Sequence, residues 1–451
     1  MDRERLGSRL GFILLSAGCA IGCGNVWKFP WLTGQYGGGA FVLVYLIFLV
    51  IMGWPVMTME FAMGRASQKS PVHMYQVLEP RGTNWHWHGI AALVGNVVLM
   101  MFYMVVTGWM LQYFFYMCTG EFTGKTPAEV GQSFGALLAN PTTQLLDTAA
   151  IVITAFIVLS FSLKGGLERV TKWMMMALIV LMVIIAINSL TMDGVKEGLT
   201  FYLLPDFGKI NWSVIVAAMN QAFFTLSLGI GAMAIFGSYI EKNHTLGGES
   251  VRVIILDTFV AVTAGLIIFP ACFTYGVNPD AGPSLIFVTL PNIFNHMPAG
   301  RFWGALFFVF MMFACYSTVL AVCENILACV RDLTGWERKK SAWICGVAML
   351  LLAAPCALGF NVLSNIHPMG GSSSIMDLED FIVSNCLLPL GSLIFVLFCT
   401  LKKGWGWENF IAEANTGHGI LFRKGLRLYC TFILPLIILT IFIAGIIPFL
   451  K

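Results

Sequence analysis

The chain has 451 residues, of which 58% are hydrophobic and 11% are charged, and its formal net charge is +3. Soluble domains carry about 25% charged residues, so this composition excludes an ordinary soluble protein and indicates a membrane protein. The small net charge points to no nucleic-acid partner, and we expect none.

Long apolar stretches follow one another along the chain. Each is suited to crossing the ~30 Å hydrocarbon core of a bilayer, which takes about 20 helical residues. They predict an all-α membrane protein, a single transmembrane domain with eleven transmembrane helices. The expected helices cover about 9–34, 40–66, 89–118, 147–163, 169–191, 213–239, 251–276, 301–329, 341–358, 377–401 and 426–449.

The first stretch is interrupted at its centre. It contains Gly18, Gly22 and Gly24, followed by Asn25 and Lys28. The spacing of Gly18 and Gly22 also fits a helix-packing motif, but that alternative explains neither the Asn nor the Lys. A transmembrane helix must satisfy its own backbone, so a break is tolerated only where the freed groups line an enclosed cavity. We therefore predict that helix 1 is broken at mid-membrane.

A second interruption, at residues 221–231, falls in the sixth stretch. Two broken helices, one in each half of a chain, are typical of the binding site of a secondary transporter. Helices 1–5 and 6–10 each begin with a broken helix, and because five is odd the second set is inverted in the membrane. We expect repeat one at about 9–191, repeat two at about 213–401 and an extra helix at about 426–449.

Basic residues predict the orientation. With a cytoplasmic N-terminus, most Lys and Arg residues fall at the inner ends of the helices, as the positive-inside rule requires. The outer side then holds only Lys125, Lys196, Lys209, Arg301 and Lys451. We expect a multi-pass protein of the cell membrane with an extracytoplasmic C-terminus.

Three further patterns carry weaker expectations. The twelve cysteines are scattered without a CxxC motif, so we predict no structural disulfide. His86 and His88 flank a Trp just before a span; such a cluster can bind metal, but an interfacial anchor is the commoner arrangement and the one we expect. Turn residues at 277–283 and an apolar run at 289–294 predict a loop that folds back as short helices.

Position-specific motifs extend over nearly the whole chain. They are Gly-x-Ala-Ile-Gly-x-Gly-Asn-Val-Trp-x-Phe-Pro at 18–30, Tyr-Gly-Gly-Gly-Ala-Phe at 36–41, Glu-Phe-Ala-Met-Gly-Arg at 60–65, Phe-Phe-Thr-Leu-Ser-Leu-Gly at 223–229 and Gly-Pro-Ser-Leu-Ile-Phe at 282–287. With them the chain resembles the neurotransmitter:sodium symporter family, and most of all its bacterial amino-acid transporters of the leucine-transporter fold. Many bacterial members also have eleven helices.

The resemblance implies two sodium sites built from hard, mostly neutral oxygen ligands. The first would use the Ala20 carbonyl, the Asn25 amide oxygen, Thr225 and Asp257, together with the substrate carboxylate. The second would use the carbonyls of Gly18, Ile21 and Ala314 and the hydroxyls of Ser317 and Thr318.

Taken alone, without the family resemblance, these residue types give unequal support to an ion site. Hydroxyls such as those of Ser317 and Thr318 more commonly bond back to their own helix. A carboxylate inside a span, such as Asp257, is functional by default. Asp257 also brings a negative charge to the first site, so we expect no chloride requirement.

The resemblance also implies a substrate site between the two breaks. The substrate carboxylate would meet the N–H groups of Cys23 and Gly24 and the Tyr103 hydroxyl. Its ammonium group would meet the carbonyls of Ala20, Phe224 and Thr225 and the Ser227 hydroxyl. The side-chain pocket would be lined by Leu99, Tyr103, Phe224, Ile230, Thr318 and Val322. Taken alone, Tyr103 is more simply explained as a buried Tyr bonded to a helix carbonyl.

The resemblance further implies two ion pairs that act as gates. Lys28 and Asp380 would close the outside, and Arg3 with Asp332 would close the inside near Ser238 and Tyr239. Each pair by itself is also explained as interfacial charge, except that Lys28 lies too deep in its span.

The chain departs from the family pattern at several positions. Lys28 stands where an Arg is usual, and a Lys makes a point contact instead of a bidentate one. Leu6 stands where a Trp is usual, which suggests a looser inner plug. Gly166 is followed ten residues later by Met176, where many relatives have a Pro, which puts in doubt their route for releasing the second sodium ion.

These observations favour a sodium-coupled symporter of neutral hydrophobic L-amino acids that works by alternating access and does not require an oligomer. A proton-coupled carrier of the same fold and a non-transporting amino-acid receptor are the alternatives. Asn25, Thr225, Ser317 and Thr318 together favour sodium over protons. An enzyme is not expected, because the sequence shows no acid–base pair, nucleophile arrangement or HExxH motif.

Overall fold

The computed structural model describes residues 4–277 and 285–447. Its α-helices are α1 Arg9–Ala20, α2 Phe29–Gln35, α3 Gly39–Phe48, α4 Trp54–Ser67, α5 Pro71–Leu78, α6 Trp87–Thr119, α7 Pro127–Ala139, α8 Pro141–Ser160, α9 Arg169–Ser189, α10 Val195–Leu203, α11 Trp212–Thr225, α12 Ala232–Gly237, α13 Leu246–Thr274, α14 Leu290–His296, α15 Gly300–Thr334, α16 Arg338–Leu358, α17 Ile375–Asp380, α18 Leu388–Thr400, α19 Trp407–Ala414 and α20 Leu434–Ile446.

The described part of the chain is all-helical and contains nine helical segments long and apolar enough to cross a membrane. A tenth appears if Arg9–Ala20 and Gly24–Gln35, which meet at an angle of 51°, are counted as one span. The expected sixth span is divided into α11 and α12 by six residues and is not among these ten. The prediction of eleven helices therefore stays a prediction, while the all-helical membrane class is confirmed.

Several boundaries differ from the expected ones because polar residues also form helices. Residues 119–146, which lie between two of the expected spans, contain α7 and the first six residues of α8. Thr126 and Glu129 form a capping box at the start of α7, which explains a helix in so polar a segment. Of the expected fold-back loop, Leu285–Thr289 and α14 are helical, whereas residues 278–284 lie outside the described part.

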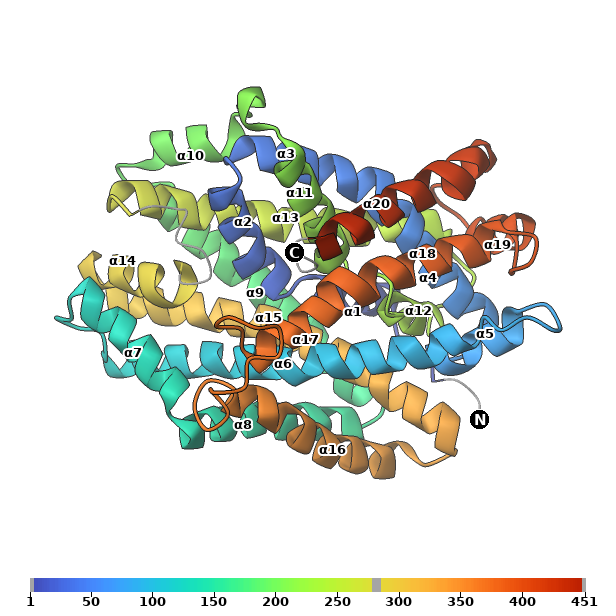
Figure 1. Ribbon diagram of the computed structural model, residues 1–451, viewed down its shortest axis with the longest axis horizontal. Coiled ribbons are helices and arrows are strands. Elements are labelled where there is room, and N and C mark those ends of the chain that lie inside the picture. The colour runs from blue at the N-terminus through green and yellow to red at the C-terminus, as the bar shows by residue number, and fades with distance from the viewer. Residues whose placement is uncertain (1–3, 278–284, 448–451) are drawn as a thin grey trace.

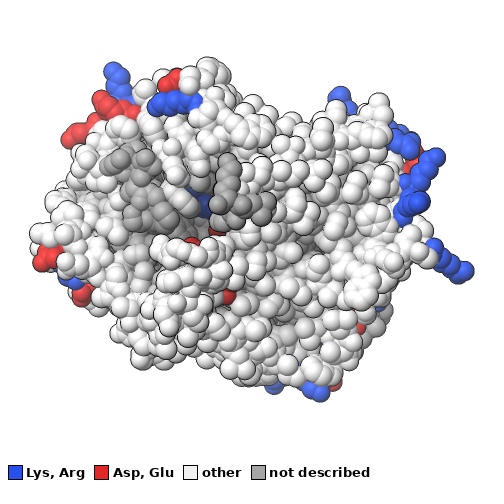
Figure 2. All heavy atoms as spheres, in the orientation of Figure 1, with Lys and Arg blue, Asp and Glu red and all other residues white. Residues whose placement is uncertain are grey.

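The long helices run roughly along the longest axis of the molecule (Figure 1). α6 packs against α15, and α8 packs against α16. Charged side chains gather at the two ends of this axis, and the surface between them is almost uncharged (Figure 2). Lys and Arg predominate at the end that holds α5 and α19, which we call the N-terminal end because the described chain begins there, with Glu4 bonded to Arg331. An uncharged belt between charged ends is the surface that a bilayer requires.

Both expected breaks are present, and they lie side by side. α1 ends at Ala20 because Ile21 is extended (φ −74°, ψ 99°), and a π-helical turn at Gly24–Lys28 leads into α2. α11 ends at Thr225, after which Ser227, Gly229 and Gly231 all have positive φ. Two features require glycine at position 229: its φ is +94°, and an added Cβ would overlap the backbone of α18. α1 contacts α12, and the turn at 24–28 contacts α11.

A buried ion pair holds α19 against α4 at the N-terminal end. The Arg65 side chain is fully buried, and its Nε donates to Glu413 Oε1 at 2.6 Å. The guanidinium also donates to the backbone carbonyls of Glu413 and of His244, the latter at 2.7 Å. One arginine thus joins three segments that are distant in sequence.

We expect Arg65→Ala to destabilise the protein by about 3 kcal/mol, because it removes the buried partner of Glu413. Among the described residues, the Glu413 carboxylate then keeps only the ion pair with Lys242, whose side chain is 61% exposed and whose Nζ lies 3.4 Å away. The measurement is thermal unfolding of the purified protein in detergent. Arg427→Ala is the matched control, since Arg427 and Glu408 form a pair whose side chains are 50% and 76% exposed. Equal unfolding temperatures for the two variants would contradict this assignment.

Candidate functional site

Two side chains converge on Asp257 of α13, and all three were expected to bind the same ion. Asn25 Nδ2, in the first break, donates to Asp257 Oδ1 at 2.8 Å, and the Thr225 hydroxyl donates to the same oxygen at 3.2 Å. Asn25 Oδ1 accepts from the Gly22 N–H at 3.2 Å, which stabilises the unwound turn. Asp257, Asn25 and Thr225 are all buried. The breaks of α1 and α11 are thus joined through one carboxylate.

Two residues that sequence reasoning missed complete this cluster. The Tyr45 hydroxyl lies 3.5 Å from Asp257 Oδ2, and Gln221 Nε2 donates to the Gly24 carbonyl at 2.7 Å. Gln221 stands at the start of the second interrupted stretch, where a polar side chain in an apolar helix was the available signal. Tyr45 has no such signal, since a Tyr is common in transmembrane helices.

The five oxygen atoms expected to bind a second ion also lie close together. Ser317 Oγ lies 3.0 Å from the Gly18 carbonyl, 3.4 Å from that of Ile21 and 2.9 Å from that of Ala314. Thr318 Oγ1 lies 3.2 Å from the Gly18 carbonyl and 3.3 Å from that of Ile21. With the Cys19 carbonyl, 3.3 Å from Thr318 Oγ1, two hydroxyl protons face four carbonyls. Hydrogen-bond acceptors therefore exceed donors, which is the environment that a hard cation requires.

The alternative explanation, that these two hydroxyls bond to carbonyls of their own helix, describes one contact of Ser317 but not those of Thr318. Ser317 does lie within reach of Ala314 on its own helix, as back-bonding requires. The Thr318 contacts are instead to α1 carbonyls, including that of Cys19 at 3.3 Å. The pair therefore bridges α15 to the unwound end of α1.

Tyr103 of α6 contacts the first break directly. Its hydroxyl accepts the Cys23 N–H at 2.7 Å, so the alternative that it is bonded to a helix carbonyl does not describe this contact. Gly22 lies so close to this hydroxyl that an added Cβ would overlap both Tyr103 Oη and Thr318 Oγ1. The break can approach α6 and α15 only because position 22 is a glycine.

A cavity of about 10 Å³ lies between the breaks. We call it the break cavity; its lining residues are Cys19, Ala20, Gly22, Gly24, Leu99, Tyr103, Phe224, Ser227, Thr318 and Leu388. Ser227 donates to the Cys19 carbonyl at 3.2 Å. Leu388 was missed by sequence reasoning. Ile230 and Val322, which were expected here, are buried but do not line this cavity.

A larger cavity of about 510 Å³ adjoins the break cavity. We call it the vestibule. Tyr103 and Phe224 line both cavities and therefore separate them. In the vestibule wall Lys28 Nζ lies 3.7 Å from Asp380 Oδ1 and 4.1 Å from the centre of the Phe224 ring. One ammonium group thus links the α17 carboxylate to the ring that separates the two cavities.

A network of charges closes the N-terminal end. The Tyr239 hydroxyl donates to Glu324 Oε1 at 2.8 Å, and the Arg338 guanidinium makes two bonds to the Glu324 carboxylate, at 2.9 and 2.5 Å. Glu4 accepts from Arg331 at 2.9 Å and lies 3.6 Å from Arg338. Burial alone raises the pKa of Glu4, but the Leu163 N–H, Arg338 and Arg331 hold that pKa below its usual value.

The expected inner gate is only partly described. Arg3 lies outside the described residues, and Asp332 accepts the Ser70 N–H at 2.8 Å. Ser238 donates to the Ile235 carbonyl at 2.7 Å. Glu324 was missed by sequence reasoning, although a carboxylate within an expected span was a signal.

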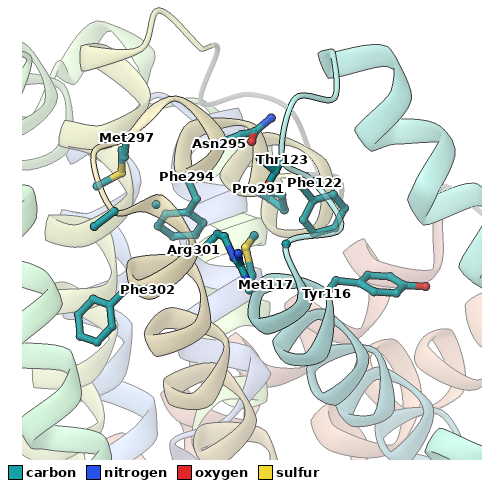
Figure 3. Close-up of a pocket in the computed structure, with 13 residues that line it drawn as sticks. Tyr116, Met117, Phe122, Thr123, Pro291, Phe294, Asn295, Met297, Arg301 and Phe302 are labelled. Carbon is teal, nitrogen blue, oxygen red and sulfur yellow. The ribbon is translucent and has the colours of Figure 1, made fainter.

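A third cavity, of about 500 Å³, lies between α6, α14 and the start of α15, away from the breaks. Apolar side chains line it, among them Met117, Phe294 and Met297, with the Arg301 guanidinium at its side (Figure 3). Arg301 bonds the Cys118 carbonyl at 2.5 Å. This cavity holds none of the expected site residues.

The two histidines near the start of α6 bind different partners. His86 Nδ1 lies 2.7 Å from Glu79, and His88 Nδ1 lies 2.8 Å from the Tyr75 hydroxyl. Among residues 4–277 and 285–447, no group of three or more His, Cys, Asp or Glu side chains is arranged to hold a metal ion.

Comparison with known proteins places this architecture among transporters. A family model described as the sodium:neurotransmitter symporter family matches residues 3–131 and 132–451. The sodium-dependent transporter YhdH of Bacillus subtilis is 34% identical over 97% of this chain and 96% of its own length. The sodium-dependent serotonin transporter of Drosophila melanogaster is 24% identical over 98% of this chain and 76% of its own length.

A solved structure has a closely similar fold. The crystal structure of MhsT in complex with L-phenylalanine is 39% identical in sequence and superposes with a TM-score of 0.89. The match covers 98% of this chain and 100% of that one.

We expect Gly22→Ala to weaken apparent sodium affinity at least tenfold, because the new methyl group pushes the break away from Tyr103 and Thr318. The measurement is the rise in unfolding temperature as sodium replaces potassium, since a ligand that binds the native state stabilises it. Gly135→Ala is the control, because a Cβ at Gly135 meets nothing within 4 Å. A sodium response in Gly22→Ala equal to that of the control would rule out this role for position 22.

Proposed function

We propose, since the chain belongs to the sodium:neurotransmitter symporter family, that this sodium-dependent transporter is a symporter of neutral hydrophobic L-amino acids working by alternating access. The observation that carries the proposal is the convergence of two helix breaks and two oxygen clusters around the break cavity. Each break offers carbonyls to a cation and N–H groups to an anion, as a substrate and its coupling ion require.

The first sodium ion would lie beside Asp257. Its proposed ligands are Ala20, Asn25, Thr225, Asp257 and the substrate carboxylate. The contacts of Asn25 and Thr225 with Asp257 support this position, because both side chains already reach the carboxylate. To bind an ion there, the Asn25 amide would turn so that its oxygen, now bonded to the Gly22 N–H, replaces its NH2 group. A ligand shared by ion and substrate makes each favour binding of the other, which is the basis of coupling.

The second sodium ion would lie where Ser317 and Thr318 face the α1 carbonyls. Its proposed ligands are Gly18, Ile21, Ala314, Ser317 and Thr318, and the surplus of carbonyls over hydroxyl protons supports it. An ion here would bind α1 to α15, so its release would free the two helices from each other.

The substrate would occupy an enlarged break cavity. Its carboxylate would accept from the N–H groups of Cys23 and Gly24, releasing the Tyr103 hydroxyl to donate to it. Its ammonium group would meet Ser227 and the carbonyls of Ala20, Phe224 and Thr225. Since the cavity is only about 10 Å³, binding requires the side chains that line it to move apart. Leu99, Ile230, Thr318 and Val322 would then border the side chain with Phe224.

Alternating access would open the two ends in turn. Lys28 with Asp380 would close the outer end, where the vestibule lies, and the cluster of Tyr239, Glu324 and Arg338 would act with Arg3 and Asp332 at the inner end. We place the N-terminal end in the cytoplasm. The excess of Lys and Arg at this end supports that orientation.

A proton-coupled carrier and a receptor are the rival functions. Apart from Asp257, the proposed ligands at both ion positions are neutral oxygens, which favour sodium over protons. Counterflow of labelled phenylalanine into proteoliposomes preloaded with unlabelled phenylalanine separates a carrier from a receptor. A carrier accumulates label transiently and only with sodium, whereas binding without counterflow would support a receptor.

We expect leucine, methionine and the aromatic amino acids to be the strongest competitors in that assay. The proposed pocket side chains Leu99, Phe224, Ile230 and Val322 are apolar, so a charged substrate side chain would be buried unpaired at a cost of several kcal/mol. One methylene is worth only ~1 kcal/mol, so selectivity within this group should be shallow. All twenty amino acids are tested; glutamate, lysine or glycine as the strongest competitor would refute the pocket assignment.

We expect Asn25→Ala and Asp257→Ala each to abolish sodium-dependent phenylalanine binding while the protein stays folded, because both side chains would contact the first ion. Binding is measured against sodium concentration, and far-ultraviolet circular dichroism checks folding. The first ion is misplaced if either variant keeps the affinity and the sodium dependence of the parent.

We expect replacement of chloride by gluconate to leave uptake nearly unchanged. Asp257 already supplies a negative charge beside the first ion, and at short range in a poorly solvated site that charge is a large favourable contribution. Initial uptake is measured in both salts at constant sodium. A many-fold loss in gluconate would show that Asp257 does not provide this charge.

A further inference from the structure

Two thiols are in contact beside the break in helix 1. Cys23 Sγ, in the unwound part of helix 1, lies 2.7 Å from Cys315 Sγ of α15, and both side chains are buried. This is closer than two unbonded thiols normally approach and only a little beyond the ~2.05 Å of a disulfide bond. The sequence predicts no structural disulfide, and neither cysteine forms one in the structure.

The two thiols differ in access. Cys23 lines the vestibule of about 510 Å³, whereas Cys315 is not among the residues that line it. A small oxidant in the vestibule therefore meets Cys23 first, with Cys315 behind it. A thiol that borders a cavity, with a second thiol next to it, is the arrangement in which a sulfenic acid is resolved to a disulfide.

The position of the pair decides what its oxidation would do. The Cys23 N–H bonds Tyr103 of α6, and its thiol contacts α15, next to the Ser317 and Thr318 hydroxyls that contact the end of α1. A covalent bond here would tie the first break to α15. Alternating access needs this break to move relative to α15, so the bond would stop transport.

We propose that Cys23 and Cys315 form a dithiol modification site, which a hydroperoxide oxidises to a disulfide that blocks transport. The consequence for transport rests on the proposed function; formation of the bond does not. The Cys23 sulfur attacks the peroxide oxygen, which gives a sulfenic acid and releases water. The Cys315 sulfur then attacks the sulfenic sulfur, displacing a second water molecule. Two thiols lose two electrons and two protons, and one peroxide is reduced to two waters.

The test treats proteoliposomes with hydrogen peroxide and measures sodium-dependent phenylalanine uptake, each variant being compared with its own untreated sample. We expect at least a tenfold loss in the parent protein, restored by dithiothreitol. Cys315→Ser should keep more than half of its untreated uptake. Cys272→Ser, which alters a buried thiol of α13, should be inhibited like the parent.

Peptide mass spectrometry provides a readout that does not need transport. In oxidised parent protein we expect a peptide pair containing Cys23 and Cys315, linked and lighter by two hydrogen atoms than the reduced pair. If the Cys315→Ser variant does not transport, the Cys315→Ala variant is used in its place. Whether the linked peptide forms in the oxidised parent protein then tests the proposal. Full inhibition without the linked peptide, or equal inhibition of parent and Cys315→Ser, overturns the proposal. A linked protein that still transports overturns the claim that the bond blocks movement.

Protection by substrate separates this proposal from the function on which it rests. Saturating sodium and phenylalanine should slow formation of the linked peptide at least fivefold, because the substrate would cover Cys23. If the linked peptide forms at the same rate with and without them, the modification site stands and the placement of the substrate carboxylate at Cys23 fails.

Discussion

The bilayer imposes one constraint on which the rest of this structure depends: backbone polar groups that leave a helix must find partners inside the protein. The constraint applies where two helices are interrupted, α1 after Ala20 and α11 after Thr225. Their freed carbonyls and N–H groups face one another across a small cavity and are surrounded by Asn25, Asp257, Ser317 and Tyr103. The backbone groups that need partners here are the same groups that would bind the proposed ion and substrate.

The way in which the breaks are held suggests how they move. Most contacts across the site are single hydrogen bonds from hydroxyl, amide or thiol groups, each worth about 1 kcal/mol net. The strong pairs, Arg65 with Glu413 and Arg338 with Glu324, lie at the N-terminal end. Under the proposed function, the weak contacts around the cavity would exchange for ion and substrate contacts, whereas the two buried ion pairs would hold the N-terminal end together.

Much of this arrangement was predictable from the sequence, because its signals are violations of the apolar pattern. Glycines and Asn25 in the first span located one break, and Lys28 and Asp257 stand out as charges within spans. What the sequence could not supply is proximity. Nothing in the pattern places Leu388 at the break cavity, Tyr45 beside Asp257 or Cys315 against Cys23, since those contacts depend on how distant helices pack. Glu324 was an exception, because its position inside a span already marked it.

The central claim is that the two oxygen clusters each hold one sodium ion. Equilibrium binding of radioactive sodium to the purified protein, with saturating phenylalanine, counts the ions directly. The account predicts two ions per chain, and one in a variant in which both Ser317 and Thr318 are changed to Ala. A single ion in the parent protein, or an unchanged count in the double variant, would contradict it.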